Sequence, residues 1–192
     1  MNTVVVLAMH GAPPNDFPQQ ELAEWFGLHG RIEHARKGEP MALEKRYAEL
    51  EARMRAWPRT AANDPFYASS LELGAQLQQV AGMSVIVGFN EFCAPSLDEA
   101  LEEAIGTGAE KVVVVTPMMT RGGEHAERDI PAAVERVQKR HAGVPIVYAW
   151  PFDPGGVAGF LAQRVRLEVT RAASQVPSEK PSRTHHLSAN GG

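Results

Sequence analysis

Two histidines and a glutamate, His10, His125 and Glu91, each follow a run rich in valine: His10 by two residues, Glu91 by four, and His125 by ten after an intervening turn. Such runs are typical of strands buried on both faces of a parallel sheet. Because the carboxyl ends of parallel strands meet at one edge, where ligands bind in open α/β folds, we expect the three side chains to lie close together. Two imidazoles and a carboxylate can hold a divalent first-row metal ion with coordination positions left open, and an imidazole can also take up a proton near neutral pH. The pattern therefore predicts a metal site with a chemical role.

The segment around His125 has the clearest local pattern. Residues 112–115 are four consecutive valines, which predicts a central strand. Residues 121–123 (Arg-Gly-Gly) form a glycine-rich turn that brings His125 beyond the carboxyl end of that strand. Residues 129–131 (Asp-Ile-Pro) predict the start of a helix, because an acidic residue and a proline are both favoured in the first turn.

Strands and helices are expected to alternate along most of the chain. The strands are predicted at residues 3–8, 83–87, 112–115 and 144–149. The helices are predicted at about residues 64–80, 97–105, 131–141 and 155–173, the second of them opened by a Ser96–Glu99 capping box. This order predicts an α/β fold, a flavodoxin-like doubly wound parallel sheet with strand order 2-1-3-4.

Residues 19–61 interrupt the alternation after the first strand. Apolar residues recur there at spacings of three and four, which predicts one buried helix face: Leu43, Tyr47, Leu50, Met54 and Trp57. Glu51 and Arg55 lie four residues apart, and we expect them to pair on the exposed side of that helix. We interpret the segment as a helical insertion that covers the first loop or forms a subunit contact.

The domain organisation follows from these elements. Residues 1–176 are expected to form a single α/β domain that includes the insertion at about residues 19–61. Residues 177–192 are polar and punctuated by proline, which predicts a disordered tail. Whether His185 and His186 in this tail bind metal stays open.

Composition excludes several classes of function. The formal net charge of −4 argues against a nucleic-acid binder that works through bulk positive charge. No apolar run approaches the roughly 20 residues of a membrane-spanning helix, and the first residues lack the charged start of a secretory signal. Cys93 is the only cysteine, so an internal disulfide and a multi-thiolate metal site are both excluded, and a cytoplasmic location is expected.

Three segments resemble the CbiX/SirB family of sirohydrochlorin chelatases. They are Met-His-Gly at residues 9–11, residues 89–101, and residues 112–131. The most specific part is the pattern Gly-x-His-x-x-x-Asp-Ile-Pro at residues 123–131. The resemblance implies ATP-independent insertion of a metal ion into a tetrapyrrole, between two flavodoxin-like lobes that are either fused or supplied by a homodimer. The insertion has no counterpart in the short members of the family.

The resemblance also implies roles for individual residues. His10 and His125 are expected to be catalytic and metal-binding, with Glu91 as their acidic partner. The metal would be the substrate, Co²⁺ or Fe²⁺, with sirohydrochlorin or a related tetrapyrrole as the second substrate and no organic cofactor. Sirohydrochlorin carries many carboxylates, so the candidates to bind it are the cations and glycine amides around His125: Arg121, Gly122, Gly123 and Arg128.

The same residues are compatible with two other classes of function. A non-catalytic carrier of metal or tetrapyrrole would use the same histidines, and metal binding without turnover would distinguish it. A flavodoxin-like nucleotide binder is disfavoured because neither GxGxxG nor GxxxxGK[ST] occurs, so no phosphate-binding loop is evident. The choice of metal is open, since two histidines and a carboxylate accept several first-row ions.

Overall fold

A computed structural model describes residues 2–33 and 41–174 of the chain. The predicted tail at 177–192, with His185 and His186, lies outside this range. The chain divides into two compact units, Met1–Phe152 and Asp153–Gly192. The first unit contains all three candidate site residues.

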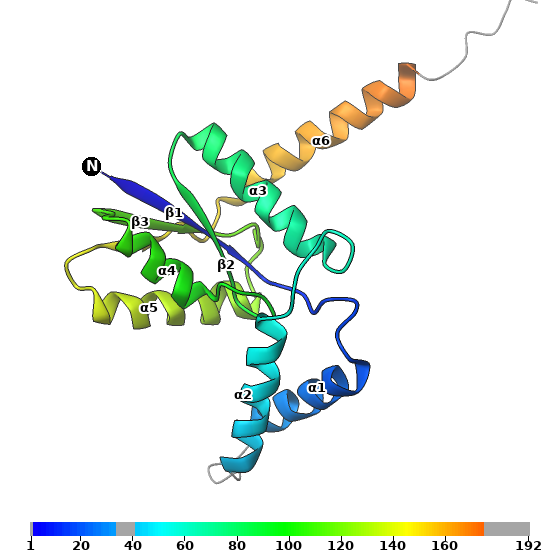
Figure 1. The fold of residues 1–192 in the computed structure, drawn as a ribbon. Coiled ribbons are helices and arrows are strands. Elements are labelled where there is room, and N and C mark those ends of the chain that lie inside the picture. The colour runs from blue at the N-terminus through cyan, green and yellow to red at the C-terminus, as the bar shows by residue number, and fades with distance from the viewer. Residues whose placement is uncertain (1, 34–40, 175–192) are drawn as a thin grey trace, which may run out of the picture. The chain divides into compact units, whose positions relative to one another are not determined.

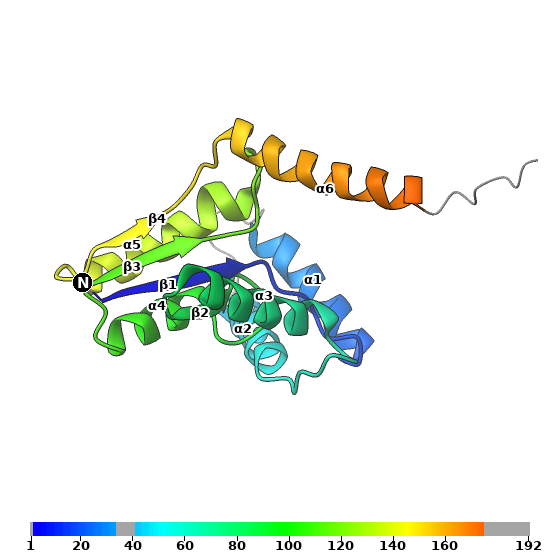
Figure 2. The same ribbon diagram turned by 90° about the horizontal axis from the view of Figure 1, so that it is seen from above.

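The first unit is built on a four-stranded, all-parallel sheet. Its strands are β1 (Thr3–Met9), β2 (Val85–Phe89), β3 (Lys111–Val115) and β4 (Ile146–Tyr148). The order β2-β1-β3-β4 confirms the predicted topology, and Figures 1 and 2 show β1 in the interior of the sheet. The second strand lies two residues later than predicted, so that Glu91 follows it almost directly.

The described part of the chain contains six α-helices, five in the first unit and one in the second. They are α1 (Gln19–Glu33), α2 (Met41–Arg55), α3 (Pro65–Ala81), α4 (Leu97–Gly106), α5 (Ile130–Arg140) and α6 (Pro154–Ser174). The capping box of α4 is present as predicted, with Ser96 and Glu99 each bonded to the backbone of the other. None of the described helices is long and apolar enough to cross a bilayer.

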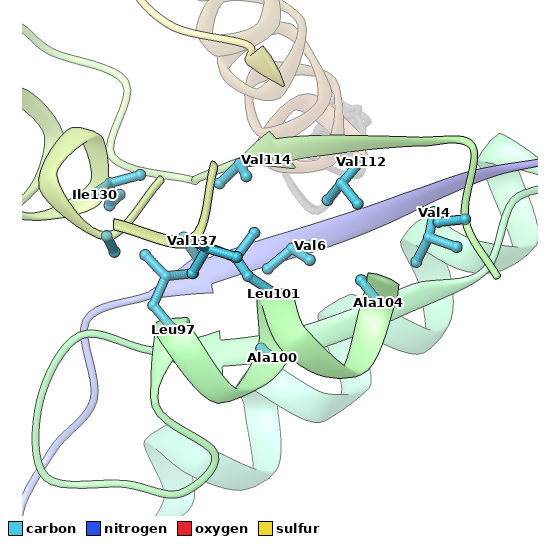
Figure 3. Packing of buried hydrophobic residues seen from close by; sticks show 13 residues of the cluster. Val4, Val6, Leu97, Ala100, Leu101, Ala104, Val112, Val114, Ile130 and Val137 are labelled. Carbon is cyan, nitrogen blue, oxygen red and sulfur yellow. The ribbon is translucent and has the colours of Figure 1, made fainter. Parts of the chain in front are cut away.

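One face of the sheet packs on α4 and α5. Valines of β1 and β3 meet small and branched side chains of the two helices in a fully buried layer (Figure 3). The residues labelled there are Val4, Val6, Val112, Val114, Leu97, Ala100, Leu101, Ala104, Ile130 and Val137. The alternation of Val112 and Val114 with more exposed neighbours gives β3 one fully buried face rather than the two that were expected.

The opposite face of the sheet packs on the insertion and α3. Trp25 of α1 and Leu50 and Met54 of α2 are buried in one cluster with Leu7 of β1 and Phe89 of β2. The predicted helical insertion is therefore confirmed, and it is part of the core. Trp57 donates to Asp16 Oδ1 at 2.9 Å, so the insertion also covers the first loop, as one of the two interpretations expected.

The start of α5 differs from the prediction. Asp129 was expected to open the helix, but a π-helical turn, η1 (His125–Asp129), runs directly into α5. Asp129 makes no capping hydrogen bond; its carboxylate is bonded to the His125 ring, while the Ile130 amide donates to the His125 carbonyl. The helical geometry thus begins at His125 because this turn satisfies the backbone without a side-chain cap.

Helix α4 approaches β2 most closely at Gly88. A Cβ atom built on Gly88 would lie 2.6 Å from the Ala100 Cβ and 3.2 Å from the Leu97 Cα. The first contact is closer than two carbon atoms tolerate and the second is tight, so a side chain here would force α4 and β2 apart.

We predict that Gly88→Ala lowers the free energy of unfolding by about 1–3 kcal/mol, because overpacking a filled core displaces its elements. Urea denaturation followed by circular dichroism measures the change. Gly106→Ala is the matched control: it lies in α4 with open space at its Cβ, and should be neutral or slightly stabilising. Equal stability of the two variants would contradict the close packing.

Candidate metal centre

His10, Glu91 and His125 lie together at the carboxyl edge of the sheet, as the sequence predicted. Each can offer one ligand atom such that all three atoms lie within 4.8 Å of one another. The two imidazole rings meet edge to face, with centroids 4.3 Å apart and planes at 87°. All three side chains are partly exposed, so an ion and a second ligand can reach them.

The pairing of β1 with β2 continues into the loops that follow them. The Asn90 amide donates to the Met9 carbonyl and the Glu91 amide donates to the His10 carbonyl, both at 2.9 Å. Glu91 is therefore held beside His10 by backbone hydrogen bonds, and its position does not depend on side-chain contacts alone.

Gly11 permits this close approach. Its φ of +99° lies in the region that favours glycine, and a Cβ built on it would lie 1.9 Å from the Glu91 carbonyl oxygen. The His-Gly pair in the sequence thus has a physical reason: the histidine supplies the ring, and the glycine leaves room for the loop that carries Glu91.

The hydrogen bonds of the two rings indicate which nitrogen of each ring carries a hydrogen. His10 Nδ1 lies 2.8 Å from the Gly11 carbonyl oxygen, and His125 Nδ1 lies 2.7 Å from Asp129 Oδ2. A carbonyl and a carboxylate can only accept, so each Nδ1 carries a hydrogen and donates it. The Nε2 atom of each neutral ring is left with its lone pair, which can bind a cation or take up a proton.

Asp129 was predicted to start a helix, but its carboxylate instead contacts the ring of a candidate ligand, His125. A carboxylate that accepts a hydrogen bond from one nitrogen of a histidine ring fixes the orientation of that ring. The four-residue spacing from His125 is the signal for this contact, because side chains four apart meet on one side of a helix. This spacing can be recognised in the sequence, although it does not by itself exclude a role for Asp129 at the helix start.

The predicted substrate-binding residues around His125 have partners within the protein. The Arg121 guanidinium lies over the Trp150 ring, 5.7 Å from its centroid, and the Gly122 amide donates to Glu127 Oε1 at 3.0 Å. Arg128 pairs with Glu124 and lies 3.4 Å from Asp129 Oδ1. A clamp on substrate carboxylates formed by Arg121, Gly122, Gly123 and Arg128 stays a prediction, and the Gly122 amide is already used.

A cavity of about 450 Å³ is lined by two of the three residues, Glu91 and His125. Glu91 and His125 form one side of it, with Arg128 and Arg136 from η1 and α5. The insertion supplies the opposite side, from one residue of α1 and two of α2: His29, Tyr47 and Glu51. The helical insertion therefore shapes the space into which a ligand of the centre would extend.

The CbiX family model matches residues 64–168, more than half of the chain. The chain belongs to the CbiX family. Glu91 and His125 lie inside the matched range, and His10 lies before it. A backbone hydrogen bond, from the Glu91 amide to the His10 carbonyl, joins His10 to the segment that the family model matches.

Curated relatives of this CbiX family member are sirohydrochlorin chelatases. A sirohydrochlorin cobaltochelatase of Sulfurisphaera tokodaii is 35% identical over 89 residues, which cover 46% of this chain and 69% of that protein. A sirohydrochlorin ferrochelatase of Priestia megaterium is 32% identical over 66 residues, covering 34% and 24%. The chain thus spans about a quarter of the length of the Priestia relative.

Solved structures of the family are similar at low sequence identity. A cobalamin (vitamin B12) biosynthesis CbiX protein from Marinobacter aquaeolei VT8 is 19% identical, with a TM-score of 0.49 over 91% of this chain and 99% of that one. The sirohydrochlorin chelatase SirB from Bacillus subtilis subspecies spizizenii, in complex with cobalt, is 19% identical with a TM-score of 0.39, covering 79% and 44%.

Cys93 and Arg55 complete the surroundings of the Glu91 loop. Cys93 is fully buried, and burial raises the pKa of its thiol, as expected of a small core residue. Arg55 was expected on the exposed side of its helix, but only 19% of its side chain is exposed. Arg55 pairs with Glu51 at 3.0 Å, as predicted. It also donates to the backbone carbonyls of Asn90 and Cys93, contacts that the spacing of residues in the sequence could not reveal.

We predict that Gly11→Ala lowers the free energy of unfolding by at least about 2 kcal/mol, because the added methyl group cannot coexist with the Glu91 carbonyl and the backbone φ is positive. Urea unfolding provides the measurement. Gly27→Ala, in α1 with open space at its Cβ, is the control and should not destabilise the protein. A Gly11→Ala variant as stable as this control would show that the loop can move away without loss.

Proposed function

We propose that this CbiX family member is a metallochelatase that inserts Co²⁺ or Fe²⁺ into sirohydrochlorin or a related tetrapyrrole without ATP. The observation that carries the proposal is the grouping of His10, Glu91 and His125 within 4.8 Å beside an accessible cavity. The named activities of the relatives, cobaltochelatase and ferrochelatase of sirohydrochlorin, support the same reaction.

The reaction requires that a metal ion is delivered to the macrocycle and that protons are removed from it, and these side chains can do both. The macrocycle releases two pyrrole protons as it accepts the divalent ion, so the products are the neutral metal–nitrogen core and two protons. The Nε2 atoms of His10 and His125 can each bind the incoming ion or accept a proton, since both Nδ1 atoms already donate. Glu91 contributes negative charge that stabilises the ion before transfer.

The incomplete ligand set suits an ion that must leave. Three protein ligands leave coordination positions open, and the pyrrole nitrogens can fill them before the protein ligands dissociate. A closed four-ligand site would instead retain the metal. The partial burial of the three side chains fits this transient role.

We predict that the purified protein metallates sirohydrochlorin with Co²⁺ or Fe²⁺ faster than a protein-free blank, measured anaerobically by the absorbance of the macrocycle. His10→Ala and His125→Ala should each lower kcat/KM by about 100-fold or more, the scale of a lost general base. His141→Ala is the matched control, because that ring pairs with Glu102 at the end of α5, and should keep the wild-type rate.

Two outcomes of this assay would contradict the proposal. A wild-type rate no higher than the blank, with Co²⁺ still bound, would identify the protein as a carrier of metal or tetrapyrrole. Wild-type turnover that survives in both His10→Ala and His125→Ala would place the reaction elsewhere in the molecule.

The proposed assembly is a homodimer. The three candidate ligands remain partly exposed in one copy of the chain, whereas small-molecule sites usually bury 70–90% of the ligand surface. Helix α6, considered by itself, carries an apolar stripe at four-residue spacing, suited to packing on another apolar surface: Val157, Leu161, Val165 and Val169. The protein would thus supply two lobes as two copies of one chain.

We predict that sedimentation equilibrium gives twice the mass of one chain at micromolar concentration. Leu161→Glu with Val165→Glu should shift the distribution to monomer, because charged residues in the stripe disfavour apolar contact. Gln163→Glu, which lies on the opposite side of α6 from the stripe and is exposed, is the control. A wild-type protein that remains monomeric at all concentrations would contradict the homodimer.

The remaining expectations stay predictions. They concern a cytoplasmic location, the lack of an organic cofactor, and the lack of nucleic-acid or membrane partners.

A further inference from the structure

Two arginines at the end of the insertion bind the backbone around the candidate metal ligands. Arg55 is the last residue of α2, and Arg59 follows it by four residues. We infer that they are positioning residues, through which the insertion fixes Glu91 and His10 in the geometry that receives the metal. This inference rests on the proposed function, because it concerns the same ion.

Arg55 connects the two ends of the short loop that carries Glu91. Its Nη2 donates to the Asn90 carbonyl at 2.9 Å, and its Nη1 donates to the Cys93 carbonyl at 2.7 Å. Glu51 Oε1 accepts hydrogen bonds from Arg55 Nε at 3.1 Å and from Nη2 at 3.0 Å, and so fixes the orientation of the guanidinium. The forked guanidinium thus binds one residue before Glu91 and two residues after it, which a single ammonium group cannot do.

Arg59 connects this loop with the loop that follows His10. Its Nη1 donates to the Ala12 carbonyl at 2.7 Å, and its Nη2 donates to the Phe92 carbonyl at 2.6 Å. The side chain is 5% exposed and pairs with Asp64, which is 1% exposed and caps α3. A buried ion pair that also bonds backbone carbonyls holds both loops against the insertion.

The loop held in this way has an uncommon conformation. Phe92 has a φ of +62°, which few residues other than glycine adopt unless surrounding contacts hold them there. Its ring lies 6.2 Å from the His10 ring, nearly parallel to it, and 5.0 Å from the Trp25 ring of α1. The carbonyls on both sides of Glu91, those of Asn90 and Phe92, are each bound by one of the arginines.

These contacts separate a positioning role from simple packing. Neither arginine touches the cavity beside His125, and neither offers a ligand to a cation. Any effect of the two arginines on the metal therefore passes through the loop that carries Glu91 and the loop that follows His10. Loss of such supporting contacts in metal proteins typically weakens metal binding 10–100-fold.

The test compares Arg55→Met with Arg53→Met in the full chain. Arg53 lies on the same helix and pairs with Glu21 of α1, so its loss also removes an ion pair but none of the carbonyl contacts. Arg55 is chosen over Arg59 because removing Arg59 would strand the buried Asp64 and unfold the protein. Arg55→Lys is a second variant that retains the charge beside Glu51.

Three measurements are made on each variant: amide hydrogen exchange of residues 89–96, the dissociation constant for Co²⁺ alone, and the visible absorption of bound Co²⁺. Arg55→Met should speed exchange of the loop amides, weaken Co²⁺ binding about 10–100-fold and change the Co²⁺ spectrum. Arg55→Lys should give an intermediate weakening, and Arg53→Met should match wild type in all three measurements.

The outcomes distinguish this inference from the proposed function. Wild-type Co²⁺ affinity and an unchanged spectrum in Arg55→Met, with wild-type binding lost in His10→Ala, would overturn the positioning role alone. An equal loss of affinity in Arg53→Met would also overturn it, because the effect would then be general destabilisation. No Co²⁺ binding by the wild-type protein would overturn the proposed function, and the positioning role with it.

Discussion

The hydrogen bonds between β1 and its two parallel neighbours decide where all three candidate ligands lie. Register pairs Met9 with Phe89 and Leu7 with Val115, so the three strands end at nearly the same level. In a parallel sheet, the residues that directly follow the carboxyl ends of the strands all lie at the same edge. The backbone bond from Glu91 to His10 extends this constraint one step beyond the sheet.

The helical insertion changes what surrounds this edge. It buries Trp25, Leu50 and Met54 in the same cluster as the sheet, so its position is fixed by the core. From there it offers polar side chains to the cavity and cationic side chains to the loops. The centre is thus supported from two directions, by the sheet below and by the insertion beside it.

The strand order and the gathering of His10, Glu91 and His125 could be predicted from sequence, because buried valine runs and the geometry of parallel sheets determine both. The partners of Arg55 could not be predicted, because every residue has a backbone carbonyl and the sequence does not indicate which of them accepts a hydrogen bond from a side chain. Asp129 was ambiguous for another reason. An acidic residue before Ile-Pro suits a helix start, and the same residue four positions after His125 suits a ring contact; the π-helical turn decides between them.

The span of chain between His10 and His125 has a consequence for biosynthesis of the protein. The third candidate ligand, His125, is made 115 residues after the first, His10, beyond β3 and the turn that follows it. A chain still emerging from the ribosome, or one cut before β3, lacks the third ligand of the described centre. The three side chains can therefore come together only in molecules in which β1, β2 and β3 have already been made, whereas β4, which is made after His125, supplies none of them.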